Sequence, residues 1–143
     1  GFSAGQPGDW QRLEFGDSVI DFLTRLEHVA VRFGGDGNQG SVHQNLSQVP
    51  VVSSEVSFGS SHGIYTYNCS PQLEGNLIEG NAGHGLYHLY GAPVDRGNTI
   101  RGNQNGIVAQ GAGAAMIMPS VVPMTTRSMS RAVPPRSSRG TSR

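Results

Sequence analysis

Three pairs of residues with chemically useful side chains stand at one common spacing in the chain. Each pair is 22 positions apart, and the pairs are His62 and His84, Tyr65 and Tyr87, and Glu79 and Arg101. Two imidazoles could bind a metal or exchange protons. Two tyrosine rings could stack on sugar rings while their hydroxyls form hydrogen bonds. A carboxylate beside a guanidinium could orient an acidic sugar or abstract a proton, so the question is whether this spacing brings the members of each pair together.

The sequence contains a repeat of about 22 residues, which indicates that the two members of each pair lie close together. The segments SEVSFGSSHGIYTYN, NLIEGNAGHGLYHLY and NTIRGNQNGIVAQGA begin at Ser54, Asn76 and Asn98 and can be laid over one another. In each segment, apolar residues alternate over three to five positions before Gly or Asn intervenes, which predicts short strands and tight turns. Such a unit cannot bury its own apolar face, so copies must stack about 4.8 Å apart as a solenoid of parallel strands.

Stacking turns each repeat position into a column along the solenoid. Two columns should form the aliphatic core, and their members are Val56, Ile78 and Ile100, and Ile64, Leu86 and Ile107. We expect two structural asparagine ladders at strand ends or turns, Asn76 over Asn98 and Asn81 over Asn103, where Asn tolerates a left-handed backbone and its amide bonds to neighbouring copies. His88 should point inward above Thr66, whose hydroxyl could satisfy it.

These repeats carry a family resemblance. The pattern N-x-I-x-G-N-x-x-G-(I/L), present as NLIEGNAGHGL and NTIRGNQNGI, together with the upstream DWQRLEF and LEHVAVRFGG, resembles the right-handed parallel β-helix repeat of pectate-lyase-like and NosD-like proteins. The resemblance covers roughly residues 9–110. It implies an all-β, right-handed parallel β-helix solenoid of about four to five coils and an extracellular or cell-surface location. The fold carries many activities, so function must be argued from a site.

The upstream part of the chain repeats less regularly. VAVRFGG from Val29, followed by Ser41 and Val42, matches a degenerate copy with the glycine-rich insertion GGDGNQG, which we interpret as a long turn. Residues 10–15 alternate like a first strand. Residues 18–31 could form an amphipathic turn or two that caps the first coil, although β-branched residues favour a strand from Leu26 onward. His28 and His43 belong to separate upstream units and show no partner pattern.

The histidine and tyrosine columns each have a simpler interpretation. Asn105 continues the column of His62 and His84, and Asn is a poor zinc ligand, so the sequence predicts no metal site there. Tyr65 and Tyr87 should point outward with Tyr67 and Tyr90 close by, either as an aromatic strip that binds carbohydrate or as cross-strand pairs that stabilise the sheet by about 0.2 to 1 kcal/mol each. The next copy has Val108 at this position, so the strip ends after two rungs.

The charged column also has two interpretations. Glu79 and Arg101, with Ser57 before them, should form an exposed ion pair worth at most about 1 kcal/mol. The resemblance to pectate-lyase-like enzymes implies clustered acids that bind Ca²⁺ and an arginine that acts as the base. No acid cluster shares a column with Arg101, since Asp95 belongs to the preceding turn and Glu79 is already paired. We therefore expect no cofactor, with Ca²⁺ required only in the lyase alternative.

Composition divides the chain into two parts. All ten basic residues are Arg; five stand with all ten acids in residues 1–118, and five stand in residues 119–143 without any acid. We predict a β-helix domain over residues 1–118 and a disordered Arg/Ser/Pro-rich tail over residues 119–143. No specific nucleic-acid binding is expected, because no aromatic residue stands between the tail arginines. The single cysteine, Cys69, excludes an internal disulfide, and no apolar run approaches the length of a membrane span.

Two functions fit these observations. The first is a noncatalytic β-helix module that presents a flat face to a polysaccharide or a cell-surface glycan, with Tyr65, Tyr67, Tyr87 and Tyr90 as the binding residues. The alternative is a fragment of a polysaccharide lyase or glycoside hydrolase that uses Glu79, Asp95, Arg101, His62 and His84. Only four to five coils make a complete enzyme the less favoured choice. The unpaired strand edges at both ends of a solenoid could also support edge-to-edge self-association.

Overall fold

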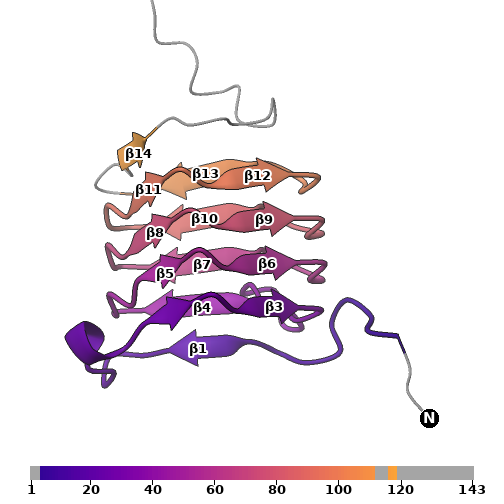
Figure 1. Cartoon of the computed structure of the whole chain (residues 1–143), viewed down its shortest axis with the longest axis horizontal. Coiled ribbons are helices and arrows are strands. Elements are labelled where there is room, and N and C mark those ends of the chain that lie inside the picture. The colour runs from indigo at the N-terminus through magenta and orange to yellow at the C-terminus, as the bar shows by residue number, and fades with distance from the viewer. Residues whose placement is uncertain (1–3, 112–115, 119–143) are drawn as a thin grey trace, which may run out of the picture.

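The chain folds as a parallel β-solenoid of about four turns in the computed structural model, which describes residues 4–111 and 116–118 (Figure 1). Successive coils lie one on another, and each side of the solenoid is a single parallel sheet. The predicted all-β parallel solenoid is therefore confirmed. The predicted tail, residues 119–143, lies outside the described residues, as does the exact boundary of the domain.

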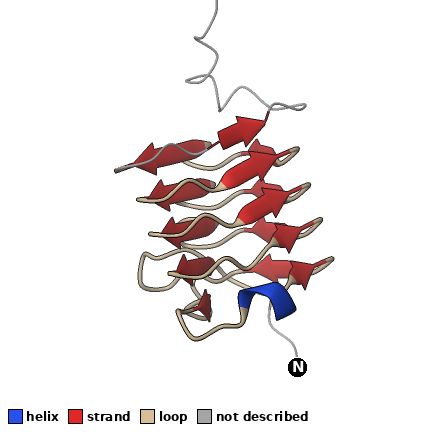
Figure 2. Ribbon diagram, turned by 90° about the vertical axis from the view of Figure 1, so that its left-hand side faces the viewer, coloured by secondary structure: helices blue, strands red, loops and turns tan. Residues whose placement is uncertain are grey.

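Three parallel sheets form the sides of the solenoid (Figure 2). Sheet A contains β1 (Leu13–Phe15), β4 (Val42–Asn45), β7 (Ile64–Tyr67), β10 (Leu86–Leu89) and β13 (Ile107–Gln110). Sheet B contains β2 (Leu26–Glu27), β5 (Val51–Val52), β8 (Gln72–Glu74), β11 (Val94–Arg96) and β14 (Met116–Met118). Sheet C contains β3 (Ala30–Arg32), β6 (Glu55–Ser57), β9 (Leu77–Glu79) and β12 (Thr99–Arg101).

The strand register confirms the repeat. Val56 pairs with Ile78, and Ile78 pairs with Ile100, each 22 positions further along the chain. In sheet A, Ile64 pairs with Leu86 at the same offset. Residues that are one repeat apart therefore lie directly above one another, so the column assignments made from the sequence hold from β6 to β13.

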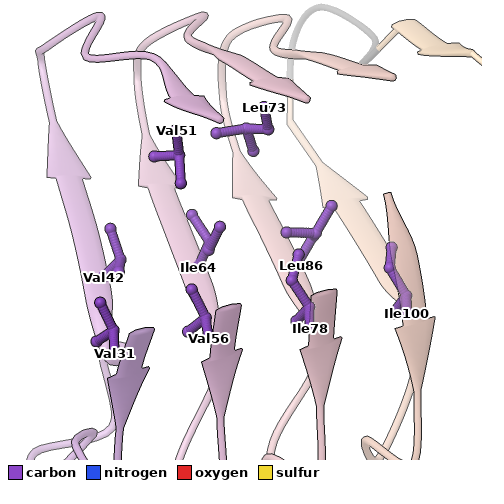
Figure 3. Packing of buried hydrophobic residues seen from close by; sticks show 9 residues of the cluster. All are labelled: Val31, Val42, Val51, Val56, Ile64, Leu73, Ile78, Leu86 and Ile100. Carbon is purple, nitrogen blue, oxygen red and sulfur yellow. The ribbon is translucent and has the colours of Figure 1, made fainter. Parts of the chain in front are cut away.

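The core is a stack of aliphatic side chains that point inward from all three sheets. Figure 3 shows nine of these side chains, which belong to Val31, Val42, Val51, Val56, Ile64, Leu73, Ile78, Leu86 and Ile100. All are buried, and full burial of one such side chain stabilises a fold by about 1.5 to 3 kcal/mol. The two predicted core columns are part of this stack, although Ile107 at the upper end is only partly buried.

Each coil turns its corners through residues with a left-handed backbone. The φ angles are positive at His28, Ser53, Gly75 and Gly97 after sheet B, at Phe33, Phe58, Gly80 and Gly102 after sheet C, and at Leu46, Asn68, Tyr90 and Gly111 after sheet A. The expectation that the ladder asparagines adopt this conformation was wrong. The glycine immediately before each of them does so instead, because it carries no Cβ.

The asparagine ladders themselves are confirmed as structural features. Asn81 donates its main-chain N–H to Oδ1 of Asn103 over 2.9 Å, and its amide donates to the main-chain oxygen of Val56 over 3.2 Å. Asn76 and Asn98 repeat this arrangement at the corner between sheets B and C. These amides satisfy main-chain groups that would otherwise be buried without partners at the corners.

The first coil differs from its predicted form. Residues 10–15 do contain a first strand, β1, and a strand does begin at Leu26. The expected single strand is divided in two, β2 in sheet B and β3 in sheet C, by the left-handed corner at His28. The amphipathic turn is reduced to a three-residue 3₁₀ helix, η1 (Asp21–Leu23). Its apolar residues do not cover the core, because Phe22 and Leu23 are 87% and 72% exposed. No helix in the described part of the chain is long and apolar enough to cross a membrane.

Candidate functional site

A cluster of five aromatic rings lies on the outer side of sheet A and beside the N-terminal ends of its strands. Its members, which we call the ring cluster, are His43, His62, Tyr65, His84 and Tyr87. Successive side chains of a strand point to opposite faces, so His43, Tyr65 and Tyr87 on β4, β7 and β10 point outward while their neighbours enter the core. The two remaining histidines stand in the turns just before β7 and β10. The fold thus brings together residues from three successive coils.

The strand column of the ring cluster runs through His43, Tyr65 and Tyr87. These residues pair in register, and their ring centroids are 4.9 Å and 5.0 Å apart. The planes are tilted by 53° and 58°, so neighbouring rings contact each other by edge and face. Tyr65 and Tyr87 remain partly exposed, whereas His43 is buried. The predicted outward position of the two tyrosines is therefore confirmed.

The turn column of the ring cluster is a stack of two imidazoles. The rings of His62 and His84 lie 4.8 Å apart with an angle of 18° between their planes. The main-chain N–H of His84 donates to Nδ1 of His62 over 3.0 Å, and the amide of Asn105 lies 3.1 Å from Nδ1 of His84. The predicted column of two histidines and an asparagine is therefore observed, and it contacts the strand column through Tyr87.

Burial holds the imidazoles of the ring cluster in their neutral form. Desolvation, with a smaller contribution from the charge of His84, lowers the pKa of His62 to about 4. Desolvation also lowers the pKa of His84 and the pKa of His43. Burial and the neighbouring tyrosines raise the pKa of the Tyr65 hydroxyl. The ring cluster is thus uncharged at neutral pH, with hydroxyls and imidazole nitrogens as its polar groups.

The hydrogen bonds of the two stacked histidines do not suit a metal. A neutral His62 that accepts at Nδ1 carries its proton on Nε2, the nitrogen that would have to bind the ion. Binding through Nε2 would require a proton on Nδ1, where the N–H of His84 already points. The described residues contain no group of three or more His, Cys, Asp or Glu side chains that could hold a metal ion.

The other two predicted binding residues are Tyr67 and Tyr90. They form a separate contact at the C-terminal ends of the strands of sheet A. Their rings meet edge to face with centroids 5.8 Å apart. Both residues are exposed, and Tyr90 occupies one of the left-handed corners. They extend the aromatic surface of sheet A but have no ring contact with Tyr65 or Tyr87 among the contacts of the described residues.

The residues of the enzymatic alternative lie in three separate places. Glu79 accepts a hydrogen bond from Nε of Arg101 over 2.8 Å on the outer face of sheet C, as predicted for an exposed ion pair. The two histidines lie before sheet A. Asp95 is not in a turn: it belongs to β11 and points into the core, where it is 2% exposed. No contact among the described residues joins these three sets.

Asp95 belongs instead to a buried polar chain with Thr66 and His88. The hydroxyl of Thr66 lies 2.8 Å from Nδ1 of His88, and Nε2 of His88 lies 2.8 Å from Oδ2 of Asp95. The predicted contact between His88 and Thr66 is confirmed. All three residues are at most 2% exposed, so this chain is closed to any substrate and stabilises the interior. The other Asp95 oxygen, Oδ1, has no hydrogen-bond partner.

The sequence interpretation missed His43, for which it found no partner pattern. The structure places it directly below Tyr65, in contact with that ring. The signal was available, because Val42–Asn45 aligns with Ile64–Tyr67 at the same 22-residue offset as the later repeats. Cys69 is buried, and burial raises the pKa of its thiol, so it is unsuited to act as a nucleophile.

Comparisons with protein-family models, with curated proteins and with solved structures give no match for this chain. The structure shows a parallel β-solenoid, and no comparison assigns the chain to the pectate-lyase-like or NosD-like proteins.

Proposed function

We propose that this protein is a noncatalytic β-solenoid module that binds a neutral polysaccharide or cell-surface glycan through the outer face of sheet A. The observation that carries this proposal is the ring cluster, an uncharged group of aromatic and imidazole rings on a flat sheet. Sugars are bound by such surfaces because ring edges and faces contact their C–H groups while hydroxyls and imidazole nitrogens form hydrogen bonds.

The distribution of charge favours a neutral ligand over an acidic one. Above β1, the outward side chains of sheet A are uncharged, and they are His43, Asn45, Tyr65, Tyr67, Tyr87, Leu89, Val108 and Gln110. The outer face of sheet C, in contrast, carries the ion pairs Arg32–Glu55 and Glu79–Arg101. An acidic polysaccharide would need cations on the binding face, and sheet A offers none above its first strand.

The hydrogen-bonding groups of the face are partly held in place before a ligand arrives. The hydroxyl of Tyr87 donates to Oε1 of Gln110 over 3.1 Å, and His62 is fixed by the N–H of His84. Groups that are already ordered lose less entropy on binding. A glycan-binding role also suits an extracellular or cell-surface location, which we include in the proposal.

The experiment is a retention assay on a panel of immobilised neutral and acidic glycans. We expect retention on neutral glycans, and we expect the double variant Tyr65→Ala with Tyr87→Ala to lose it. Phe58→Ala is the matched control, because Phe58 is a 41% exposed aromatic residue at the corner between sheets C and A and has no ring contact with the cluster. Equal retention of the double variant and the parent, with both folded by circular dichroism, would overturn the proposal.

A gentler variant keeps the test informative if the double variant does not fold. Tyr87→Phe retains the ring and removes only the hydroxyl that bonds to Gln110, so the sheet should remain intact. We expect weaker retention on neutral glycans with unchanged thermal unfolding. Production of unsaturated ends from pectin or alginate with Ca²⁺, abolished by Arg101→Ala, would instead support the lyase alternative and contradict a purely noncatalytic role.

A further inference from the structure

A hollow of about 590 Å³ opens at the N-terminal end of the solenoid, and none of its lining residues belongs to the ring cluster. It is lined by Trp10, Arg12, Leu13, Ala30, Val31 and Arg32. The hollow lies beside β3, which is the terminal strand of sheet C, and its apolar floor is formed by Leu13 and Val31 from the lowest layer of the core. It is an open surface hollow rather than an enclosed cavity, so a ligand in it would keep one side in solvent.

Trp10 forms a fixed aromatic wall of this hollow. Its indole Nε1–H donates to the main-chain oxygen of Arg32 over 2.8 Å. The ring also packs on Gly34, since a Cβ at that position would lie 2.8 Å from Cζ2 of the indole. Trp10 nevertheless remains 37% exposed. The indole is therefore held in one orientation while part of its surface is available to a ligand.

Two arginines supply the polar groups of the hollow. Arg12 uses Nε to bond to Glu14, and Arg32 uses Nε and Nη2 to bond to Glu55. Among the described residues, no hydrogen bond uses Nη1 or Nη2 of Arg12, or Nη1 of Arg32. The two glutamates do not line the hollow. A ligand inside it would thus meet an aromatic wall, an apolar floor and unused guanidinium donors.

We propose that this hollow binds a small six-membered ring that carries a carboxylate. The ring would lie against the indole of Trp10, and the carboxylate would accept hydrogen bonds from the two terminal nitrogens of Arg12, the geometry in which arginine binds carboxylates most strongly. A sugar acid and an aromatic acid share this chemistry. The proposal is independent of the function proposed for sheet A, since the two sites have no residue in common.

The chain offers a direct readout, because Trp10 is its single tryptophan. Glucuronate and benzoate are titrated into the full-length protein while the tryptophan emission is followed, and these two arms distinguish a sugar acid from an aromatic acid. We expect a saturable change with at least one of them. Arg12→Gln should raise its dissociation constant about tenfold or more, the effect of losing charge-assisted hydrogen bonds.

Arg101→Ala is the control, since it removes an arginine from another arginine–glutamate pair, on the outer face of sheet C, without touching the hollow. Its titration should match that of the parent, as should that of the Tyr65→Ala with Tyr87→Ala variant. Trp10→Phe, followed by calorimetry, should lose binding. The proposal is overturned if neither acid changes the emission, or if Arg12→Gln and Arg101→Ala bind the acid equally well.

Discussion

The side-chain oxygen of Asn98 accepts two hydrogen bonds from Asn76 in the coil below, one from its main-chain N–H over 2.9 Å and one from its amide over 3.0 Å. Asn76 in turn accepts from the N–H of Ser54 and donates to the main-chain oxygen of Val51, each over 2.9 Å. One buried amide thus joins three coils at the same corner.

Asn76→Ala should therefore be strongly destabilising. The substitution leaves the N–H of Ser54 buried without its side-chain partner and removes the amide hydrogen bonds to Val51 and Asn98, and an unsatisfied buried donor alone costs about 1 to 3 kcal/mol. We expect the free energy of unfolding in a denaturant titration to fall by roughly 2 to 4 kcal/mol. Asn105→Ala, at an exposed position, should change it by less than about 0.5 kcal/mol. Similar values for the two variants would show that the ladder is not what stabilises the corner.

The neutral state of His62 predicts a loss of stability in mild acid. Its pKa is about 4 in the folded chain and near 6.5 when unfolded. The unfolded chain therefore binds the proton first as the pH falls, and protonation also opposes the hydrogen bond from the N–H of His84. Stability is retained above about pH 6.5 and decreases between about pH 6.5 and 4, by on the order of 1 to 3 kcal/mol.

The measurement is the free energy of unfolding across this pH range for His62→Asn against the parent. The aligned residue two coils further on is Asn105, so an asparagine suits the column. The variant should show a flatter pH dependence. His28→Asn, which removes a largely exposed imidazole from another corner, serves as the control variant. Parallel curves for all three proteins would contradict the prediction.

A pair of glycines separates backbone conformation from steric crowding. A Cβ at Gly97 or at Gly16 would have no heavy atom within 4 Å apart from its own neighbours, but only Gly97 has a positive φ, of 65°. Gly97→Ala should cost about 1 to 2 kcal/mol of unfolding free energy because of the left-handed backbone alone. Gly16→Ala should be neutral or stabilising by up to about 1 kcal/mol. Thermal and denaturant unfolding of both variants measure this difference.

The buried chain of Thr66, His88 and Asp95 predicts a rescue experiment. His88→Leu leaves the carboxylate of Asp95 buried without its partner, which should cost about 3 to 5 kcal/mol. Adding Asp95→Leu, which matches Leu73 directly below it, should recover most of that loss. Denaturant unfolding of the single and double variants gives the coupling between the two positions. A double variant as unstable as the sum of its parts would contradict it.

Most of the fold could be predicted from the sequence, because a constant repeat converts sequence offset into spatial neighbourhood. Ile78 and Ile100 lie one above the other, as do Tyr65 and Tyr87, since nothing between them changes the coil length. The first coil was harder. Val31 pairs with Val56 at an offset of 25, and Leu13 pairs with Val42 at 29, so no single period reveals these partners.

The candidate site was only partly accessible to the same reasoning. The 22-residue repeat places His62 near His84 and Glu79 near Arg101. It does not specify how close two different columns lie to each other. The contact of His62 with Tyr87 depends on how the turn before β7 places the imidazole against the strand of the next coil. The inward position of Asp95 was missed because the strand β11 is only three residues long and was taken for a turn. The hollow beside Trp10 depends on the irregular first coil, where no repeat applies.

The connections that lead from sheet C to sheet A vary in length, and this has a consequence for the binding face that we propose. Residues 33–41 separate β3 from β4, whereas only residues 58–63 separate β6 from β7, and the corners between sheets B and C keep one length throughout. His62 and His84 stand in the corners whose length varies. New recognition loops could therefore be inserted beside the ring cluster, coil by coil, while the inner stack and its ladders retain their spacing.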